Sequence, residues 1–169
     1  LDYSPQMKIL ATGCAIGFLK EIVNRDFVSI AVRDDQKMTI GDRTLHFMFV
    51  PNLHWPDTMY TFIEEEQILV TCDSFGSHYC LPEVISTEIK NENDYQKALK
   101  YYYDCIIGPF KPFMLKALDR VENMDISMIC TGHGPVLVGD RIKTVMKQYR
   151  EWSTLVNPNQ KKTVIMPYV

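Results

Sequence analysis

Three residues that could bind metal follow predicted strands in this chain. His54 comes after the β-prone run LHFMFVPN, Asp73 comes after ILVTC, and His133 comes after ISMICTG. Because the carboxyl ends of strands in layered α/β proteins converge on one edge, loops there can direct side chains at a common ligand. Two imidazoles and a carboxylate suit iron, zinc or manganese, and a single carboxylate can bridge two metals. The three residues therefore predict a metal centre at one edge of a sheet.

Each of these residues also has a simpler role when it is taken alone. A single loop histidine is more often a hydrogen-bonded surface residue, and an aspartate after a strand commonly forms a turn or caps a helix. For His133, the two flanking glycines of TGHGPV favour the metal-binding interpretation, because they let the backbone approach closely. The prediction of a metal centre rests on the position of all three residues directly after predicted strands.

The elements that must position these residues follow from the hydrophobic periodicity. In the first half we predict a strand over residues 8–11, a helix over 14–23 and a strand over 27–32. Two hairpins follow, the first turning at Gly41-Asp42-Arg43 and the second at the EEEQ of MYTFIEEEQILVTC. The middle of the chain is therefore predicted to be a sheet built from hairpins.

The second half of the chain changes to helical spacing. Two predicted helices are separated by Gly108, Pro109 and Pro112, because proline can begin a helix but cannot continue one. A buried strand follows in ISMIC, and Asp140 is predicted to cap a last helix. The order of strands and helices predicts an α/β fold. The apolar faces of the first two helices are formed by Leu99, Tyr102 and Ile106 and by Met114, Leu118 and Val121.

Composition and charge narrow the classes of partner. The chain has 169 residues, of which 46% are hydrophobic, and this suffices for one domain with a core. The net charge is −3, with Lys and Arg scattered among acids, so we expect no binding of nucleic acid or anionic lipid. No apolar run reaches the roughly 18 residues that a membrane span needs. Since no segment resembles a signal peptide, we expect a cytoplasmic protein.

The cysteines predict neither disulfides nor a zinc cage. There are five of them, an odd number, and no C-x-x-C pair occurs. We expect all five to be reduced. Cys72 and Cys130 end apolar runs, so we expect them to behave as small buried hydrophobic residues.

Three segments resemble successive motifs of one protein family. LHWPDTM, CDSFGSH and CTGHGPV are similar to motifs of the flavodiiron proteins, whose diiron domain has the metallo-β-lactamase fold. LKYYYDCIIGPF resembles a tyrosine-containing helix near the diiron pocket, and QYREWS followed by KKTVIMPYV resembles the passage into the flavodoxin domain. HWPD is the most specific of these, because hydrolases of the same fold share the ligand histidine but not the tetrapeptide. The resemblance implies an αββα sandwich.

The resemblance assigns metal-binding roles to the three candidates. It implies that His54 binds one iron, that His133 binds the other, and that Asp73 bridges the two. The same three residues were predicted to bind metal from their donor atoms and their positions after strands, so the two assignments agree.

Three aromatic residues acquire candidate catalytic roles in the same way. Trp55 would line the pocket, and Tyr102 or Tyr103 would offer a phenol to a bound diatomic substrate. The tyrosines of the run at residues 101–103 are also good core residues, and that alternative stays open.

The implied function of the family is the reduction of small diatomic molecules. Its two non-haem irons reduce dioxygen to water, or nitric oxide to nitrous oxide, with electrons from FMN in the flavodoxin domain. The electron donor would be rubredoxin or a flavoprotein reductase. Zinc could substitute for iron on the same donors.

The sequence departs from the family pattern at one ligand motif. Family members carry a further motif, H-x-E-x-D-H, and this chain contains no such sequence. The two remaining histidines are not expected to replace it, because His46 alternates within a strand and should face the other side, and His78 lies outside the pattern. Three ligands over two metals leave each short of the usual three or four protein donors. We therefore expect the chain alone to bind metal weakly and to be inactive.

The most economical interpretation is a fragment of a longer flavodiiron-like oxidoreductase. Residues 1–152 would form a partial metallo-β-lactamase-like domain, comprising its C-terminal half and part of the other sheet. Residues 153–169 would be a linker and the first strand of a flavodoxin-like domain, which ends before any loop that could hold a flavin phosphate. The absent half would leave one sheet face bare, so we expect two copies to pair as a homodimer.

Two other functions stay open on the sequence alone. A zinc-dependent hydrolase of the same fold could use the same His and Asp positions to activate hydroxide against an ester or phosphodiester. HWPD and the flavodoxin-like tail argue against it. The second alternative is a degenerate scaffold or interaction module that kept the fold without its metals.

Overall fold

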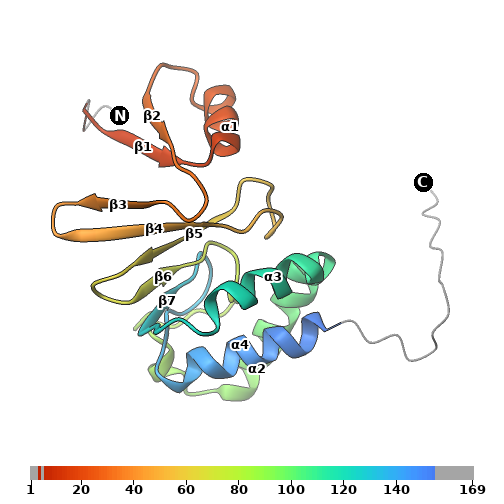
Figure 1. Cartoon of the computed structure of the whole chain (residues 1–169). Coiled ribbons are helices and arrows are strands. Elements are labelled where there is room, and N and C mark those ends of the chain that lie inside the picture. The colour runs from red at the N-terminus through yellow and green to blue at the C-terminus, as the bar shows by residue number, and fades with distance from the viewer. Residues whose placement is uncertain (1–3, 5, 155–169) are drawn as a thin grey trace, which may run out of the picture.

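Two β-sheets of unequal size organise the protein (Figure 1). The computed structural model describes residue 4 and residues 6–154. In the smaller sheet, β1 (Lys8–Ala11) pairs in parallel with β2 (Val28–Ala31), and α1 (Gly13–Val23) connects them. Thr12 caps α1, because its side-chain oxygen accepts a hydrogen bond from the backbone N–H of Ala15 at 3.1 Å. The predicted strand, helix and strand of this segment are confirmed.

The larger sheet has six strands arranged in sequence order. Its first four strands form antiparallel hairpins, as predicted, and Gly41 in the first turn has a φ of +63°. The step from β6 to β7 is parallel, and such a step needs a long crossover connection. The strands are β3 (Lys37–Ile40), β4 (Arg43–Phe49), β5 (Met59–Ile63), β6 (Ile68–Val70), β7 (Met128–Cys130) and β8 (Leu137–Val138).

Helices supply the crossover and pack against the larger sheet (Figure 1). A short 3-10 turn (Ser86–Glu88) precedes α2 (Glu92–Tyr102), and α4 (Asp140–Ser153) follows β8. Between α2 and α3 (Lys111–Val121) the chain forms a π-helical turn and then a 3-10 turn. These two turns span Tyr103–Ile107 and Gly108–Phe110, the region where the sequence predicted an interruption.

One face of the larger sheet forms the core with the helices. The cross-strand register places a row of hydrophobic residues on this face, and each of them is at most 9% exposed. They are Met48, Tyr60, Phe62, Leu69 and Ile129. The helices contribute, among others, Leu99, Met114, Leu118, Val145 and Tyr149 to the same core.

The opposite face of the larger sheet is covered only in part. Phe47 on this face is buried, but Met59, Thr61 and Ile63 of β5 are half-buried, and Val70 of β6 is 41% exposed. The helix α1 of the smaller sheet likewise has no buried residue. This face of the larger sheet therefore exposes apolar side chains, and a bare sheet face was expected from the sequence.

Two local expectations are corrected by the structure. Asp140 does not cap α4, because Gly139, with a φ of +58°, occupies the cap position and Asp140 is the first helical residue. Cys72 is exposed and Cys130 is half-buried, so neither is a fully buried hydrophobic residue. All five cysteines are free, as expected.

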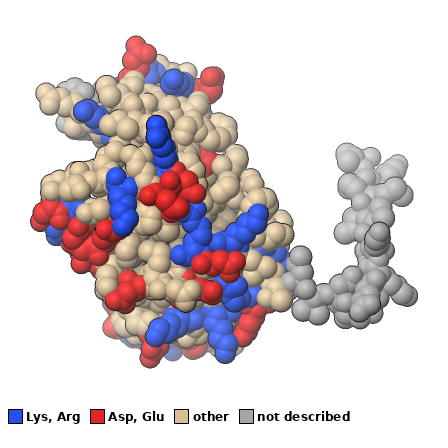
Figure 2. All heavy atoms as spheres, viewed as in Figure 1, with Lys and Arg blue, Asp and Glu red and all other residues tan. Residues whose placement is uncertain are grey.

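The surface carries charges of both signs. Figure 2 shows Lys and Arg intermixed with Asp and Glu over the face in view. Such mixing fits the scattered charge pattern of the sequence. Among the described residues, no helix is both long and apolar enough to cross a membrane.

Candidate metal centre

The structure brings His54, Asp73 and His133 together at one edge of the larger sheet. Asp73 lies between the two imidazoles: its Oδ2 is 3.4 Å from Nε2 of His54, and its Oδ1 is 3.4 Å from Nε2 of His133. The Asp73 side chain is 14% exposed, whereas those of His54 and His133 are 31% and 50% exposed. Each histidine therefore faces a different oxygen of one largely buried carboxylate. The two imidazoles are more exposed to solvent than the carboxylate between them.

His54 extends from the loop that joins β4 to β5. The loop is closed at its base by a hydrogen bond from Val50 N to Thr58 O at 3.0 Å. Inside it, Asn52 N donates to Trp55 O at 2.8 Å, and the Thr58 hydroxyl donates to the same oxygen at 2.8 Å. Leu53, next to His54, is fully buried and anchors the loop. The backbone hydrogen bonds of this loop are thus largely internal.

Asp73 and His133 belong to two loops that interlock. Thr71 N donates to Cys130 O at 3.0 Å, in continuation of the β6–β7 pairing, and Ser77 N donates to His133 O at 3.1 Å. Gly134 has a φ of +85°, and a Cβ at this position would overlap Ser77. The glycine predicted to allow close approach next to His133 therefore does so.

Tyr102 and Tyr103 are adjacent in sequence but lie in different surroundings. The Tyr102 ring centroid is 5.7 Å from that of His133, at the candidate centre. Burial raises the pKa of the Tyr102 phenol, and the nearby Asp73 carboxylate raises it further. The Tyr103 hydroxyl instead lies 2.8 Å from the hydroxyl of buried Ser153, in the core. Tyr102 is the last residue of α2 and Tyr103 the first of the π-helical turn, and consecutive residues of a helix point in different directions.

Trp55 lies beside His54 and is largely exposed. The two ring centroids are 5.8 Å apart, and Trp55 is 59% exposed. Trp55 also lines a surface cavity of about 490 Å³ between the loop and α1. The other lining residues are Ala15, Phe18, Leu19, Glu21, Ile22 and Asp57.

The two remaining histidines have different relations to the centre. His46 lies elsewhere, with its Nε2 3.2 Å from Asp35 Oδ1. His78 lies near it: its ring centroid is 4.9 Å from that of Tyr102 and 5.4 Å from that of His133. This proximity was not predicted. The sequence does place His78 in the same CDSFGSH segment as Asp73, which could have indicated it.

The donor set fits a carboxylate-bridged pair of metals in kind but is incomplete in number. Imidazole and carboxylate suit iron and zinc, and the two carboxylate oxygens face two separate imidazoles. Within residues 4 and 6–154, no group of three or more His, Cys, Asp or Glu side chains converges to hold a metal ion. Each position between an imidazole and Asp73 thus has two of the three or four protein donors that a non-thiolate site usually has.

Comparison with known proteins identifies the family. Residues 1–134 match the sequence model of the ODP family beta lactamase. The chain belongs to this family. It is 37% identical, over 163 residues, to Flavo-diiron protein FprA2 of Clostridium acetobutylicum, a match that covers 95% of this chain and 41% of the relative. It is 38% identical, over 172 residues, to Diflavin flavoprotein A 1 of a Synechocystis species, covering 100% of this chain and 29% of that protein.

Solved structures of family relatives have the same fold. The flavodiiron protein from Giardia intestinalis superimposes with a TM-score of 0.81 at 31% identity, covering 86% of this chain and 36% of that one. Rubredoxin oxygen:oxidoreductase from Desulfovibrio gigas gives a TM-score of 0.81 at 26% identity, covering 86% and 37%. The resemblance to flavodiiron proteins and their metallo-β-lactamase-like fold is therefore confirmed. The chain spans 41% or less of the length of these relatives and corresponds to part of a domain.

Proposed function

We propose that this chain provides part of the diiron centre of a flavodiiron-type oxidoreductase, which reduces dioxygen to water or nitric oxide to nitrous oxide. The observation that supports it most directly is the placement of His54 and His133 on opposite oxygens of Asp73. The names of the relatives, which include flavo-diiron and oxygen:oxidoreductase proteins, support the same reaction class.

In this proposal the three candidate ligands divide between two irons. His54 would hold one iron, His133 would hold the other, and the Asp73 carboxylate, which lies between the two imidazoles, would be shared by both. The remaining donors come from the H-x-E-x-D-H segment of a longer protein, since relatives extend well beyond this chain. When bound, the irons supply the redox chemistry and a positive charge for the diatomic substrate.

Neighbouring aromatic side chains orient the substrate and limit access by water. Tyr102, whose ring centroid is 5.7 Å from that of His133, would donate its phenolic hydrogen to a bound diatomic molecule. Trp55, beside His54, forms a wall on the solvent side. Tyr103 is assigned no contact with substrate, because its hydroxyl is paired with Ser153 in the core.

FMN in the flavodoxin-like domain of the longer protein would supply electrons to the irons. The names of two relatives, diflavin flavoprotein and rubredoxin oxygen:oxidoreductase, motivate FMN as cofactor and rubredoxin or a flavoprotein reductase as donor. Residues 153–169 were predicted to be the linker and first strand of that domain. Ser153 is instead the last residue of α4 and is buried in the core, and residues 155–169 lie outside the described part of the chain. We place the protein in the cytoplasm.

The chain by itself is proposed to be inactive and to form a homodimer. Inactivity follows from the two-donor count at each metal position. Pairing would cover the partly open sheet face, on which Val70 is exposed.

Substitution of the three ligands in the longer protein tests the proposed function. Oxygen and nitric oxide consumption should be abolished by His54→Ala, Asp73→Ala and His133→Ala. Asp119→Ala is the matched control for Asp73→Ala and should retain activity, because Asp119 pairs with Arg150 between helices α3 and α4, away from the centre. Ester or phosphodiester hydrolysis with zinc, without diatomic reduction, would instead support a hydrolase. Undetectable metal in the intact protein would support a scaffold.

A further inference from the structure

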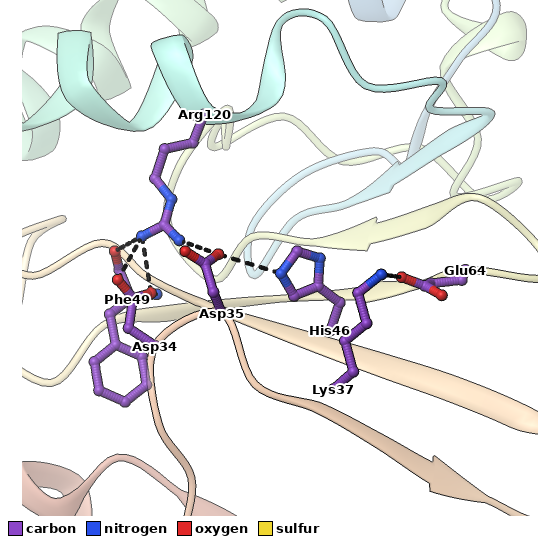
Figure 3. Close-up of polar contacts among 7 residues, drawn as sticks. All are labelled: Asp34, Asp35, Lys37, His46, Phe49, Glu64 and Arg120. Carbon is purple, nitrogen blue, oxygen red and sulfur yellow. Dashed lines mark hydrogen bonds and ion pairs between the residues drawn. The ribbon is translucent and has the colours of Figure 1, made fainter.

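Arg120 joins three segments of the chain at the point where β4 ends (Figure 3). Its Nη1 donates to Asp34 Oδ1 at 2.9 Å and to the backbone oxygen of Phe49 at 2.8 Å. Its Nη2 donates to Asp35 Oδ1 at 2.6 Å. Arg120 belongs to α3, the two aspartates belong to the β2–β3 connection, and Phe49 is the last residue of β4.

The network completes the hydrogen bonding of β4 beyond the end of its neighbour. β3 begins at Lys37, and the backbone pairing continues only as far as Phe47 N, which donates to Gln36 O at 2.9 Å. One step further, Phe49 N donates to the Asp34 side chain at 2.7 Å, and Phe49 O accepts from Arg120. Both backbone polar groups of Phe49 are thus held by charged side chains where a strand would otherwise hold them.

Phe49 is also the residue from which the His54 loop departs. Val50, the next residue, closes that loop by its bond to Thr58. The direction in which the loop leaves the sheet is therefore set by Phe49 on one side and by the internal hydrogen bonds of the loop on the other. Asp73 and His133 are held differently, by the interlocked loops after β6 and β7.

We propose that Arg120 and Asp34 are positioning residues for His54. They hold the end of β4 so that the loop of residues 50–58 presents the imidazole to Asp73. The importance of this orientation rests on the proposed metal-binding role of His54. Neither residue touches the candidate centre, and both act through the Phe49 backbone.

The first arm of the test measures the loop without metal. Hydrogen exchange by NMR should show faster exchange of the Val50, Asn52 and Thr58 amides in Arg120→Met than in the unaltered chain. Arg150→Met is the matched control, because Arg150 of α4 pairs with Asp119 and Glu122 at 2.8 and 2.7 Å, away from the loop. Unchanged exchange of the three amides in Arg120→Met would overturn the proposal.

The second arm uses zinc as the probe and reads each imidazole separately. In the longer protein with labelled histidines, Arg120→Met should raise the zinc concentration that half-shifts the His54 ring signals by about tenfold. The His133 signals should respond as in the unaltered longer protein, a selectivity that general destabilisation would not give. A His54 response to zinc that is the same in the variant and in the unaltered longer protein would also overturn the proposal.

Further variants distinguish the positioning role of Arg120 and Asp34 from the metal-binding role of His54. Arg120→Lys keeps the charge but not the two-pronged guanidinium, and should give a smaller change in the same direction. Should Arg120→Met fail to fold, Asp34→Asn is measured with the same expectations. Faster amide exchange in Arg120→Met, together with no zinc response of His54 in the longer protein with an unaltered Arg120, would refute the metal role of His54 while leaving the positioning role intact.

Discussion

Gly134 determines how closely the loops of Asp73 and His133 can approach. Its φ of +85° is strained for any residue with a Cβ, and a Cβ would overlap Ser77. We predict that Gly134→Ala lowers the free energy of unfolding by about 2 kcal/mol, measured by urea denaturation. The variant should also separate His133 from Asp73.

Gly17→Ala is the control for this prediction. Gly17 lies in α1, and a Cβ there would meet no atom within 4 Å. Because alanine favours helix over glycine, this substitution should raise the free energy of unfolding by up to about 1 kcal/mol. A Gly134→Ala chain as stable as the unaltered chain would show that the loops are not held as tightly as described.

The adjacent tyrosines should respond differently to loss of their hydroxyl groups. Tyr103→Phe leaves the buried Ser153 hydroxyl without its partner and should lower the free energy of unfolding by about 1–2 kcal/mol. Tyr102→Phe should instead lower diatomic reduction by the longer protein about tenfold, the equivalent of one hydrogen bond of about 1.4 kcal/mol. Thermal melts and turnover assays of both variants separate the two roles. A fall in turnover for Tyr103→Phe alone would reverse the assignment.

At the residue scale, the sequence predicted which side chains meet but not all of their neighbours. His54, Asp73 and His133 could be found because each follows a recognisable strand. The proximity of His78 and the exposure of Cys72 could not, because they depend on the path of the loop. Cys72 and Phe75 turn that loop with φ values of 52° and 65°, which side-chain type alone does not reveal.

At the scale of elements, α2 and α4 are joined by an ion pair whose strength depends on pH. Arg141 Nη1 lies 2.6 Å from Glu92 Oε1, and this hydrogen bond holds the pKa of Glu92 below its usual value. Because the folded-state pKa is lowered, the stabilisation is complete above the unfolded-state pKa and is lost as the pH falls through the folded-state pKa.

We therefore predict a pH-dependent effect of Glu92→Gln on the melting temperature. The variant should melt below the unaltered chain at pH 6, and the difference should shrink as the pH falls below the usual titration range of a glutamate carboxyl. Glu151→Gln is the control, since the Glu151 carboxylate lies 4.0 Å from Lys147 on the same helix. A difference that stays constant from pH 6 to pH 3 would exclude the ion pair as its cause.

Hydrophobic spacing predicted the long elements and missed the irregular ones. The hairpins and the three helices of the second half follow periods of two and about 3.6, which side-chain type reveals. The π-helical turn over Tyr103–Ile107 was not predicted, because a single wide turn hardly changes the apolar spacing. β8 has only two residues, too few for a pattern, and its direct passage through Gly139 into α4 explains the wrong cap at Asp140.

At the scale of the whole molecule, we propose that the partly open face of the larger sheet mediates pairing of two copies. Val70 on this face is 41% exposed, and the proposed homodimer would bury it. Sedimentation should show a dimer of the unaltered chain at micromolar concentration and a monomer of Val70→Lys. Tyr101→Lys is the control and should remain dimeric, because Tyr101, 68% exposed, lies on α2 away from that face. A stable monomer of the unaltered chain would contradict the pairing.

Iron content tests most directly whether this chain carries only part of the metal ligands. The measurement is elemental analysis after anaerobic reconstitution with ferrous iron, on this chain and on a protein extended upstream through the H-x-E-x-D-H segment. We predict two irons per chain in the longer protein, almost none in this chain, and loss of both irons in the Asp73→Ala form of the longer protein. Stoichiometric iron in this chain alone would contradict the incomplete ligand set, and full iron content in Asp73→Ala would contradict the role of Asp73 as a shared ligand.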